Sequence, residues 1–380
     1  MKKRDSVSNN ADHYYAQSQW QLEPIRVGES FMAMTGRFED AQFLDYLRRD
    51  NGVVEYVEPN QYYQADMILP SNTKTMSFDD LSMAAASDTA HTLRVSQAAN
   101  WGLSRITHRV NTDLSSYSYH DNDGQGVHVY VLDSGINVDH SDFGGRATSE
   151  INFVSNEPDD DMGGHGTHVA GKIGGKQYGV AKGVSLHAVK ILDKSGMGTT
   201  SGLIHALSHV IDIAPPGKSL INLSLSGPKS NILNEVLKET TEVHNIPVFV
   251  SAGNSGSDAC YFSPSSSEHV FAVGATDIHD RVPNYSDIGE CVSIYAPGSS
   301  IKSTWIGSKD ATQVLDGTSM ANPHVVGIAA ILMAEHSYES VKDLYAALRS
   351  MATADALTFS DKVSVESASS NLLAYHSPTN

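Results

Sequence analysis

The chain has 380 residues, of which 40% are hydrophobic and 18% are charged, a composition typical of a globular protein with one large and one small domain. Its formal net charge of -18 argues against a nucleic-acid partner, because contacts with phosphates need a basic surface. No apolar segment approaches the length of a membrane-spanning helix, so we also expect no membrane partner.

The first 66 residues are predicted to form a small α+β domain. We expect helices over residues 11–22 and 41–49, and strands over residues 31–35 and 53–62. The basic N-terminus is followed by polar residues rather than by an apolar segment, so no secretory signal peptide is visible. Taken alone, this unit is also compatible with an independent binding module.

Residues 67–97 lack hydrophobic periodicity and mix polar residues with small ones. A segment of roughly 30 residues without regular structure is far longer than an ordinary loop. We therefore expect an exposed linker, which is the kind of segment in which proteolytic cleavage concentrates.

The pattern changes from Trp101 onward, where short apolar segments alternate with helical stretches. This alternation predicts an α/β fold in which helices cover both faces of a mostly parallel sheet. Strands are expected at residues 127–132, 186–192, 220–225, 248–251, 270–274 and 292–296. Helices are expected at residues 168–173, 201–213, 232–244 and 341–351, and from Ser319 onward.

Three polar residues lie where such a sheet gathers its reactive side chains, at strand ends and at the starts of the helices that follow. Asp133 ends an apolar strand, His165 lies between glycines at a helix start, and Asn254 follows a strand in a glycine-rich turn. Histidine is the side chain best suited to move a proton near neutral pH. Asp133 and Asn254 each have a commoner explanation as turn residues.

Ser319 precedes an apolar segment, residues 325–333, that predicts a buried helix with Pro323 in its first turn. At a helix N-terminus the free N–H groups and the helix dipole favour developing negative charge. A hydroxyl group there is well placed to attack a carbonyl carbon. A serine at a helix start is more commonly an N-cap, however.

Histidines and cysteines give little support to a metal site. His165 and His168 have the spacing of a metal pair, but no acidic residue lies at helical spacing, and Gly166 disfavours a helix interior. Cys260 and Cys291 lie in no CxxC or Cys/His cluster, which argues against zinc. Whether they form one disulfide is left open.

The order Asp133, His165, Ser319 is the order of the triad in subtilisin. Residues 131–135, 165–171 and 317–324 resemble the three active-site motifs of the subtilases, and their joint occurrence is specific. Two further segments, residues 101–106 and 371–375, resemble fungal, cerevisin-type members of the proteinase K branch. The resemblance covers residues 98–376 and extends weakly over residues 28–63, which resemble part of an inhibitory propeptide.

The resemblance implies a domain organisation. Residues 98–380 are expected to form a three-layer, subtilisin-like peptidase domain, preceded by the propeptide domain at residues 1–66 and a linker at 67–97 with a processing site. Relatives carry an initial propeptide strand and a signal sequence, and neither is visible here, so we interpret the start as truncated. Relatives are vacuolar or secreted, which is the ground for expecting the same location.

The resemblance also implies an activity, that of a serine endopeptidase made as a self-processing zymogen. Ser319 is the expected nucleophile, His165 the base and Asp133 the residue that orients it, with Asn254 and the Ser319 N–H binding the oxyanion. A catalytically silent, prosegment-bound protein that acts as a binding partner or inhibitor is the alternative. A nucleophile-elbow hydrolase would need G-x-S-x-G, which the residues around Ser319 do not match.

By similarity, substrate lies as an extended strand between two segments of the peptidase domain. The residues expected to bind it are Gly196, Met197 and Gly198 in one segment and Ser224, Leu225, Ser226 and Gly227 in the other. Because these segments contain no charged residue, we expect a broad, apolar-leaning preference in the first pocket. The expected partners are protein and peptide substrates and the chain's own propeptide, and the expected state is a monomer.

Three residues depart from the usual pattern of the relatives. Asn322 stands where relatives carry threonine or serine, and we expect retained activity with altered packing. Ser226 replaces a common glycine and is expected to narrow the first pocket. Ser293 replaces an aspartate that binds calcium in relatives. We therefore expect no cofactor, and calcium binding at that place is in doubt.

Overall fold

The computed structural model describes residues 22–29, 31–37, 41–49, 54–55, 57–69, 93–359 and 370–378. The helix expected over residues 11–22 lies outside the described residues except for Leu22, which begins a strand. Most of the expected linker, residues 70–92, also lies outside them.

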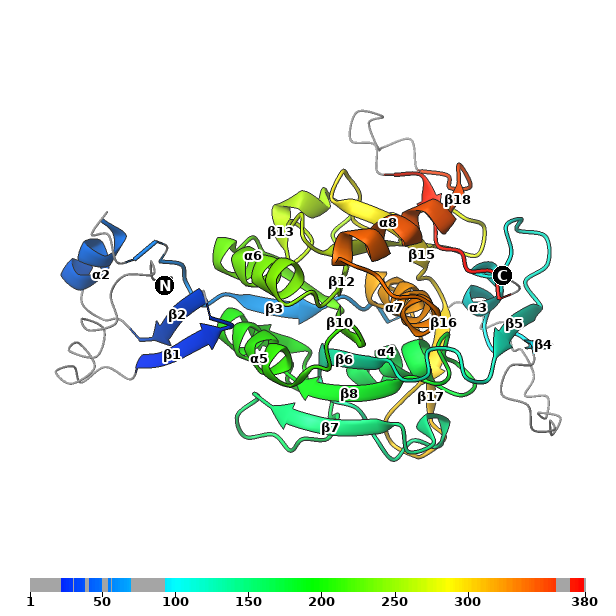
Figure 1. Ribbon diagram of the computed structural model, residues 1–380, viewed down its shortest axis with the longest axis horizontal. Helices are drawn as coiled ribbons and strands as arrows, with labels where there is room; N and C mark the ends of the chain where they lie inside the picture. The colour runs from blue at the N-terminus through cyan, green and yellow to red at the C-terminus, as the bar shows by residue number, and fades with distance from the viewer. Residues whose placement is uncertain are drawn as a thin grey trace.

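The centre of the fold is a nine-stranded sheet, parallel except where β18 meets β19 at one edge (Figure 1). In spatial order its strands are β18 (Thr353–Ala354), β19 (Leu372–Leu373), β15 (Val292–Pro297), β14 (Phe271–Thr276), β12 (Val248–Ser251), β10 (Ser219–Leu223), β6 (His128–Asp133), β8 (Ser185–Lys190) and β7 (Ala147–Asn152). All six strands predicted from Trp101 onward belong to this sheet. Edge strand β7 was not predicted, because its sequence is largely polar.

Helices cover both faces of the sheet, which confirms the predicted three-layer α/β fold (Figure 1). One face packs against α4 (His165–Gly174), α7 (Thr318–Glu335) and α8 (Val341–Met351), and the other against α5 (Thr200–Ile213) and α6 (Asn231–Lys238). Successive residues of β6 show why the strands are apolar throughout. Val129 and Val131 pack on the α4 side, whereas Tyr130 and Leu132 pack on the α5 side.

The direction of the strand order changes at β6. After β6 the chain adds β7 and β8 on one side, then returns and adds β10, β12, β14 and β15 on the other. In open parallel sheets, sites form at the carboxyl ends of strands next to such a change of direction. The carboxyl ends of β6, β10 and β12 are therefore the expected place for a site.

Smaller elements complete the peptidase domain: β4 (Leu93–Gln97), α3 (Trp101–Arg105), β5 (Ser116–His120), η1 (Ser141–Phe143), η2 (Glu239–Val243), η3 (Ala259–Tyr261), β13 (Phe262–Ser263), β16 (Ile301–Thr304) and β17 (Thr312–Leu315). Strand β4 pairs with β5 although it lies inside the segment expected to be linker. Its side chains are half-exposed or exposed, so no hydrophobic pattern marked it. Cys260 and Cys291 form a disulfide, which the sequence had left open.

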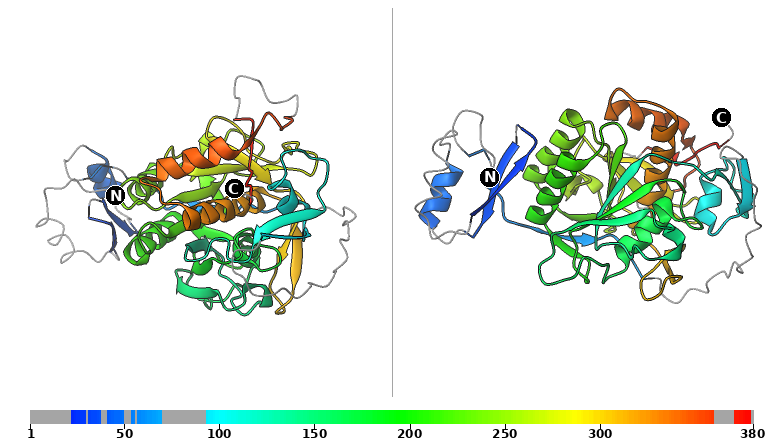
Figure 2. Two further views of the ribbon diagram at one scale, coloured as in Figure 1. Left: turned by 45° about the vertical axis from the view of Figure 1, so that its right-hand side comes forward. Right: turned by 60° about the horizontal axis from the view of Figure 1, so that its bottom comes forward.

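The N-terminal unit contains β1 (Leu22–Val27), β2 (Phe31–Gly36) and α2 (Ala41–Arg48). Strand β2 and helix α2 confirm two expected elements, whereas β1 was not expected. The β1–β2 hairpin lies between α2 and the helices α5 and α6 (Figure 2). Its buried side chains join the core cluster that contains these two helices, and they are Ile25, Val27, Phe31 and Ala33.

The strand expected over residues 53–62 is wrong. Residues 57–61 have no regular structure, and strand β3 begins at Tyr62 and ends at Ala65. Strand β3 pairs with β9 (Met197–Thr199) and β11 (Leu225–Pro228) of the peptidase domain rather than with the N-terminal unit. The position of β3 is thus set by partners that lie more than 100 residues away in the sequence.

Candidate active site

Asp133 and His165 meet at the carboxyl end of the sheet. Asp133 is the last residue of β6, and His165 is the first residue of α4. The His165 Nδ1 lies 2.7 Å from the Asp133 Oδ1, and both side chains are fully buried. The same carboxylate oxygen accepts a hydrogen bond of 2.7 Å from the Ser134 N–H. This geometry fixes the orientation of the imidazole ring and leaves its Nε2 on the side away from Asp133.

Helix α7 begins at Thr318, so Ser319 is its second residue. The N-cap is Gly317, and the Ser319 hydroxyl donates to the Ser224 carbonyl at 2.9 Å. The alternative that Ser319 is an N-cap is therefore wrong. Pro323 is the sixth helical residue and not part of the first turn, contrary to expectation. Because proline has no N–H, it leaves the Ser319 carbonyl without the usual helical partner.

The His165 Nε2 has no hydrogen-bond partner in the described part of the chain, although it is buried. The Ser319 hydroxyl, which the sequence predicts to be its partner, is held by the Ser224 carbonyl instead. Rotation of the Ser319 side chain about χ1 moves a hydroxyl between staggered positions at little cost. In this arrangement the Ser319 hydroxyl bonds to the Ser224 carbonyl and not to the His165 Nε2.

Asn254 lies in the turn after β12, with its side chain held by the start of α7. Its Oδ1 accepts hydrogen bonds of 2.9 Å from both the N–H and the hydroxyl of Thr318. The Nδ2 is buried and unpaired within the described structure. It lies next to Gly317, where a methyl group would be 3.1 Å from this nitrogen and 2.3 Å from the Asp66 carbonyl oxygen. A glycine is therefore required at this position.

Strand β3 lies in the cleft that the sequence predicted for substrate. On one side, Gln64 pairs with Met197, and the Ala65 N–H donates to the Gly196 carbonyl at 3.0 Å. On the other side, Ala65 pairs with Leu225. The two predicted substrate-binding segments thus enclose an extended strand of the chain itself.

Side chains of β3 alternate between the cleft and the solvent. Tyr63 and Ala65 are buried, and Tyr62 is 67% exposed. The Tyr63 ring packs against Gly227, where a methyl group would lie 2.6 Å from a ring carbon, and its hydroxyl donates to the Pro228 carbonyl. Gly198 likewise leaves no room for a side chain beside Ile191.

Asp66, which follows β3, was not singled out in the sequence. Its N–H donates to the Ser224 carbonyl at 3.3 Å, and its carbonyl accepts from the Ser319 N–H at 3.2 Å. Its carboxyl group accepts hydrogen bonds of 2.6 Å from the hydroxyls of Ser226 and Ser251. Ser251 was missed as well, because a serine at a strand end carries no distinctive signal.

Burial is the largest single influence on the pKa values of Asp66 and His165. It raises the pKa of Asp66 to about 6, against the lowering effect of the Ser226 and Ser251 hydroxyls. Burial lowers the pKa of His165, but the charge and hydrogen bond of Asp133 outweigh it, so the pKa lies above its ordinary value. The His165 imidazole therefore holds a proton more readily than an ordinary histidine does.

Asp161 is a second buried carboxylate that the sequence analysis did not select. It accepts hydrogen bonds from the Gly164 N–H at 2.7 Å, the Thr167 hydroxyl at 2.6 Å and the Ser134 hydroxyl at 2.8 Å. These bonds tie the start of α4 to the end of β6, which positions His165. An aspartate just before a helix start is the signal that marks it.

Asn322 lies one turn into α7, fully buried against the sheet. Its Nδ2 donates to the Asn222 Oδ1 at 3.0 Å, with the carbonyls of Leu223 and Phe249 each at 3.3 Å. The amide group thus links α7 to β10 and β12 close to Ser319. The asparagine thus forms hydrogen bonds at the position where relatives carry threonine or serine.

His168 plays a structural role. Its Nε2 lies 3.1 Å from the carbonyls of both Ile301 and Gln313, and burial lowers its pKa to about 3. Within the described ranges, no three histidine, cysteine, aspartate or glutamate side chains are grouped as metal ligands. Ser293 lies in β15.

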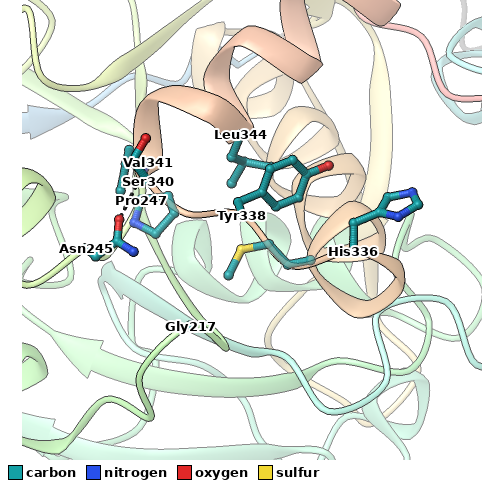
Figure 3. A pocket seen from close by; sticks show the side chains of 9 residues that line it. Gly217, Asn245, Pro247, His336, Tyr338, Ser340, Val341 and Leu344 are labelled. Carbon is teal, nitrogen blue, oxygen red and sulfur yellow. Dashed lines mark hydrogen bonds between the residues drawn. The ribbon is translucent and has the colours of Figure 1, made fainter.

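A separate pocket lies far from these residues. It is located between the C-terminal end of α7 and the start of α8, and its lining includes Met333, His336, Tyr338 and Leu344 (Figure 3). At a rise of about 1.5 Å per residue, Ser319 and Met333 are roughly 21 Å apart along α7. The pocket thus has no part in the site.

The fold and the site together define a class of protein. An aspartate after a central strand, a histidine at one helix start and a serine at another form a subtilisin-like arrangement on a mostly parallel sheet. Comparison with known families matches residues 124–371 to the subtilase family. The chain belongs to this family, as its motifs predicted.

Individual relatives agree with this assignment. The chain is 45% identical over 244 residues to Subtilisin-like protease 2 of Pseudogymnoascus destructans, a match that spans 64% of this chain and 60% of the relative. It is 44% identical over 239 residues to Proteinase T of Parengyodontium album, spanning 62% and 80% of the two chains. A crystal structure of a cold-adapted subtilisin-like serine proteinase is 40% identical, with a TM-score of 0.67, and covers 74% of this chain and 98% of that one.

Proposed function

We propose that the chain is a serine endopeptidase that is made as a zymogen and cleaves its own peptide bond between Asp66 and Met67. The observation that carries this proposal is the position of Asp66. Its carbonyl oxygen accepts a hydrogen bond from the Ser319 N–H, beside the unpaired Asn254 amide. The chain continues past Ser319, because Ile68 exchanges backbone hydrogen bonds of 2.7 and 3.1 Å with Asp316. The bond next to the serine is therefore the one that follows Asp66.

The proposed reaction follows from these contacts. The Ser319 oxygen bonds to the Asp66 carbonyl carbon while its proton passes to the His165 Nε2. The negative charge that develops on the Asp66 oxygen is stabilised by the Ser319 N–H and the Asn254 amide. The bond to Met67 then breaks, and His165 returns its proton to the new amino group. Water attacks the acyl-enzyme by the same steps and releases the Asp66 carboxyl group.

Helix capping supports the role of residues 57–66 as an inhibitory prosegment. The Glu58 carboxylate accepts from the Ser230 hydroxyl at 2.7 Å and from the Asn231 N–H at 3.0 Å, at the start of α6. The Asn60 side chain accepts from the Ser201 N–H at 2.9 Å, at the start of α5. Both contacts satisfy free N–H groups at helix N-termini. They explain how a short strand remains in the cleft.

We also propose that the chain is vacuolar or secreted. Fungal relatives in this branch are vacuolar or secreted, and the Cys260–Cys291 disulfide agrees with passage through an oxidising compartment. In the described part of the chain, no helix is long and apolar enough to cross a membrane. Fractionation of the source cells and their medium, with the chain detected by an antibody, tests the proposal: recovery in the cytosol alone would contradict it.

The general test is covalent labelling of the purified full chain with a fluorophosphonate, followed by casein hydrolysis and N-terminal sequencing. We expect label on Ser319, hydrolysis of casein and a new N-terminus at Met67. Label without hydrolysis of casein would favour the prosegment-bound binding protein. A new N-terminus elsewhere would place the processing site at a different bond.

Asn254→Ala is expected to lower kcat on the order of 10²–10³-fold with little change in KM, the size known for the corresponding donor of subtilisin. The reason is that the unpaired Nδ2 and the Asp66 carbonyl oxygen lie on the same side of Gly317, where the oxyanion forms in the proposed reaction. Steady-state kinetics on a chromogenic peptide measure the effect. Asn111→Ala, which alters a side chain bonded to the Ile278 carbonyl away from the site, is the control. A loss confined to KM would contradict the assigned role.

Glu58→Ala is expected to shorten the lag between cleavage of the prosegment and full activity by about 5- to 30-fold. A capping carboxylate at a helix N-terminus contributes roughly 1–2 kcal/mol, and its loss weakens the docked state by that amount. Casein hydrolysis by the full chain, followed from the moment of self-cleavage, gives the lag. Glu29→Ala removes an equal charge from an exposed residue of the same unit. Equal lags for the two variants would contradict the capping role.

A further inference from the structure

In the proposed cleavage, the first pocket, beside Ser319, holds the side chain of the residue before the scissile bond. Backbone contacts fix this residue as Asp66, because its N–H donates to the Ser224 carbonyl and its carbonyl faces the Ser319 N–H. The side chain of Asp66 is 5% exposed. Its surroundings therefore report what the pocket accepts.

Two hydroxyl groups converge on this side chain from neighbouring strands. Ser226 in β11 donates to one carboxyl oxygen and Ser251 in β12 donates to the other, each at 2.6 Å. Ser251 is fully buried, so its hydroxyl has no access to solvent. A buried hydroxyl without a partner costs about 1–3 kcal/mol, which penalises an apolar side chain in this pocket.

We propose that this pocket selects a short side chain with a carboxyl or carboxamide group, aspartate or asparagine, and that Ser226 and Ser251 are the residues that set the preference. The inference rests on the proposed endopeptidase function and specifies its substrate class. It replaces the apolar-leaning preference expected from the sequence, which considered the absence of charge but not the hydroxyl groups. Hydroxyls both donate and accept, so they satisfy a carboxylate, a carboxylic acid and an amide alike.

Charged groups near the pocket distinguish aspartate from asparagine. The residues of β11 and β12 that face the Asp66 carboxyl group contribute hydroxyls only. Asp287, between β14 and β15, opposes a negative charge on this carboxyl group, whereas His165 in α4 favours one. Burial outweighs these effects and raises the pKa of Asp66 to about 6. Aspartate is therefore bound best when it is protonated, and asparagine is bound without such a condition.

The first experiment uses the full chain after self-processing and a set of peptides Tyr-Gln-Ala-X with a fluorogenic leaving group, where X is Asp, Asn, Glu, Ala, Leu, Phe or Lys. We expect kcat/KM for Asp at pH 5 and for Asn to exceed that for Leu and Phe by about tenfold or more, the value of one or two hydrogen bonds. Faster cleavage after Leu, Phe or Lys would overturn the proposal.

The ratio of kcat/KM for the Asp peptide to that for the Asn peptide is expected to rise about tenfold from pH 8 to pH 5. Protonation of His165 affects both peptides equally and cancels in the ratio, which isolates the carboxyl group of the substrate. The pocket raises the pKa of that group, so binding is favoured as the pH falls through about 6. A flat or falling ratio would overturn the burial of the carboxyl group between the two hydroxyls.

The second experiment substitutes Asp66, and separately the two serines of the pocket, within the full chain. Asp66→Asn should process at the rate of the natural chain, whereas Asp66→Leu should process about tenfold more slowly. The double variant Ser226→Gly with Ser251→Ala should reverse this order, because it removes both hydroxyls and makes the pocket apolar. Intact mass against time measures each rate. The absence of a reversal would overturn the assignment of these two serines.

Fluorophosphonate labelling separates this inference from the function on which it rests. A chain that is not labelled and cleaves nothing would refute the endopeptidase proposal itself. A chain that is labelled and hydrolyses casein, but prefers apolar residues before the scissile bond, would refute the pocket assignment alone. Labelling of the double variant shows in addition that its site has folded.

Discussion

Ser319→Ala is expected to abolish both self-processing and hydrolysis of casein, with a loss in kcat on the order of 10⁶-fold, the size known for the serine of subtilisin. In the proposed mechanism Ser319 supplies the attacking oxygen, and the neighbouring Ser224 does not replace it, because Ser224 meets the Asp66 backbone through its carbonyl. The purified variant should remain a full-length chain without a new terminus at Met67. Intact mass and fluorophosphonate labelling give both results.

The loss should not come from unfolding. The Ser319 hydroxyl makes one hydrogen bond to a backbone carbonyl, and removal of such a bond costs about 1 kcal/mol. Ser350→Ala, which alters an exposed serine of α8, is the matched control and should process normally. Processing of the Ser319→Ala chain at Met67 in a host that lacks other proteases would refute self-cleavage.

Asp133→Asn is expected to lower kcat on the order of 10⁴-fold, as the same change does in the chymotrypsin triad. The variant keeps the volume of the side chain but removes the charge that stabilises the imidazolium ion. Its amide can also donate to the His165 Nδ1 and so impose the wrong tautomer. Steady-state kinetics measure the effect, with Asp139→Asn, a change at an exposed carboxylate, as the control.

The pH profile gives an independent test of the Asp133 role. Asp133 holds the pKa of His165 above the value that burial alone would produce, and kcat/KM is lost as the pH falls through that pKa. Removal of the charge lowers the pKa of His165, so the acid limb of the profile should move to lower pH in the variant. An acid limb that stays in place would contradict the electrostatic role, even if the rate falls.

Much of the fold could be predicted because it is recorded in local patterns. The central strands are apolar on both faces, and their short length between helical segments is enough to identify a parallel sheet. The site residues were found for a related reason. Asp133, His165 and Ser319 lie at the junctions of strands and helices, where such a sheet gathers its reactive side chains.

Other elements could not be predicted because their positions depend on distant partners. Strand β4 has no hydrophobic pattern and exists through its pairing with β5. Strand β3 (Tyr62–Ala65) shares only Tyr62 with its expected range, residues 53–62, because β9 and β11 provide the hydrogen bonds that define it. Pro323 was expected in the first turn of α7, but the helix begins at Thr318 because the backbone N–H and hydroxyl of that residue bond to Asn254.

The sequence by itself thus determined the family, the α/β architecture and the residues of the expected triad, since all three follow from short segments with a recognisable order. Only the tertiary structure decided which residue of the prosegment faces Ser319 and what surrounds it. The alternation of β3 shows in the sequence which of its side chains share a face, but which residue lies opposite Ser319 depends on pairing with the distant strands β9 and β11. The convergence of Ser226 and Ser251 on Asp66 depends on that pairing, and therefore appeared only once the chain was folded.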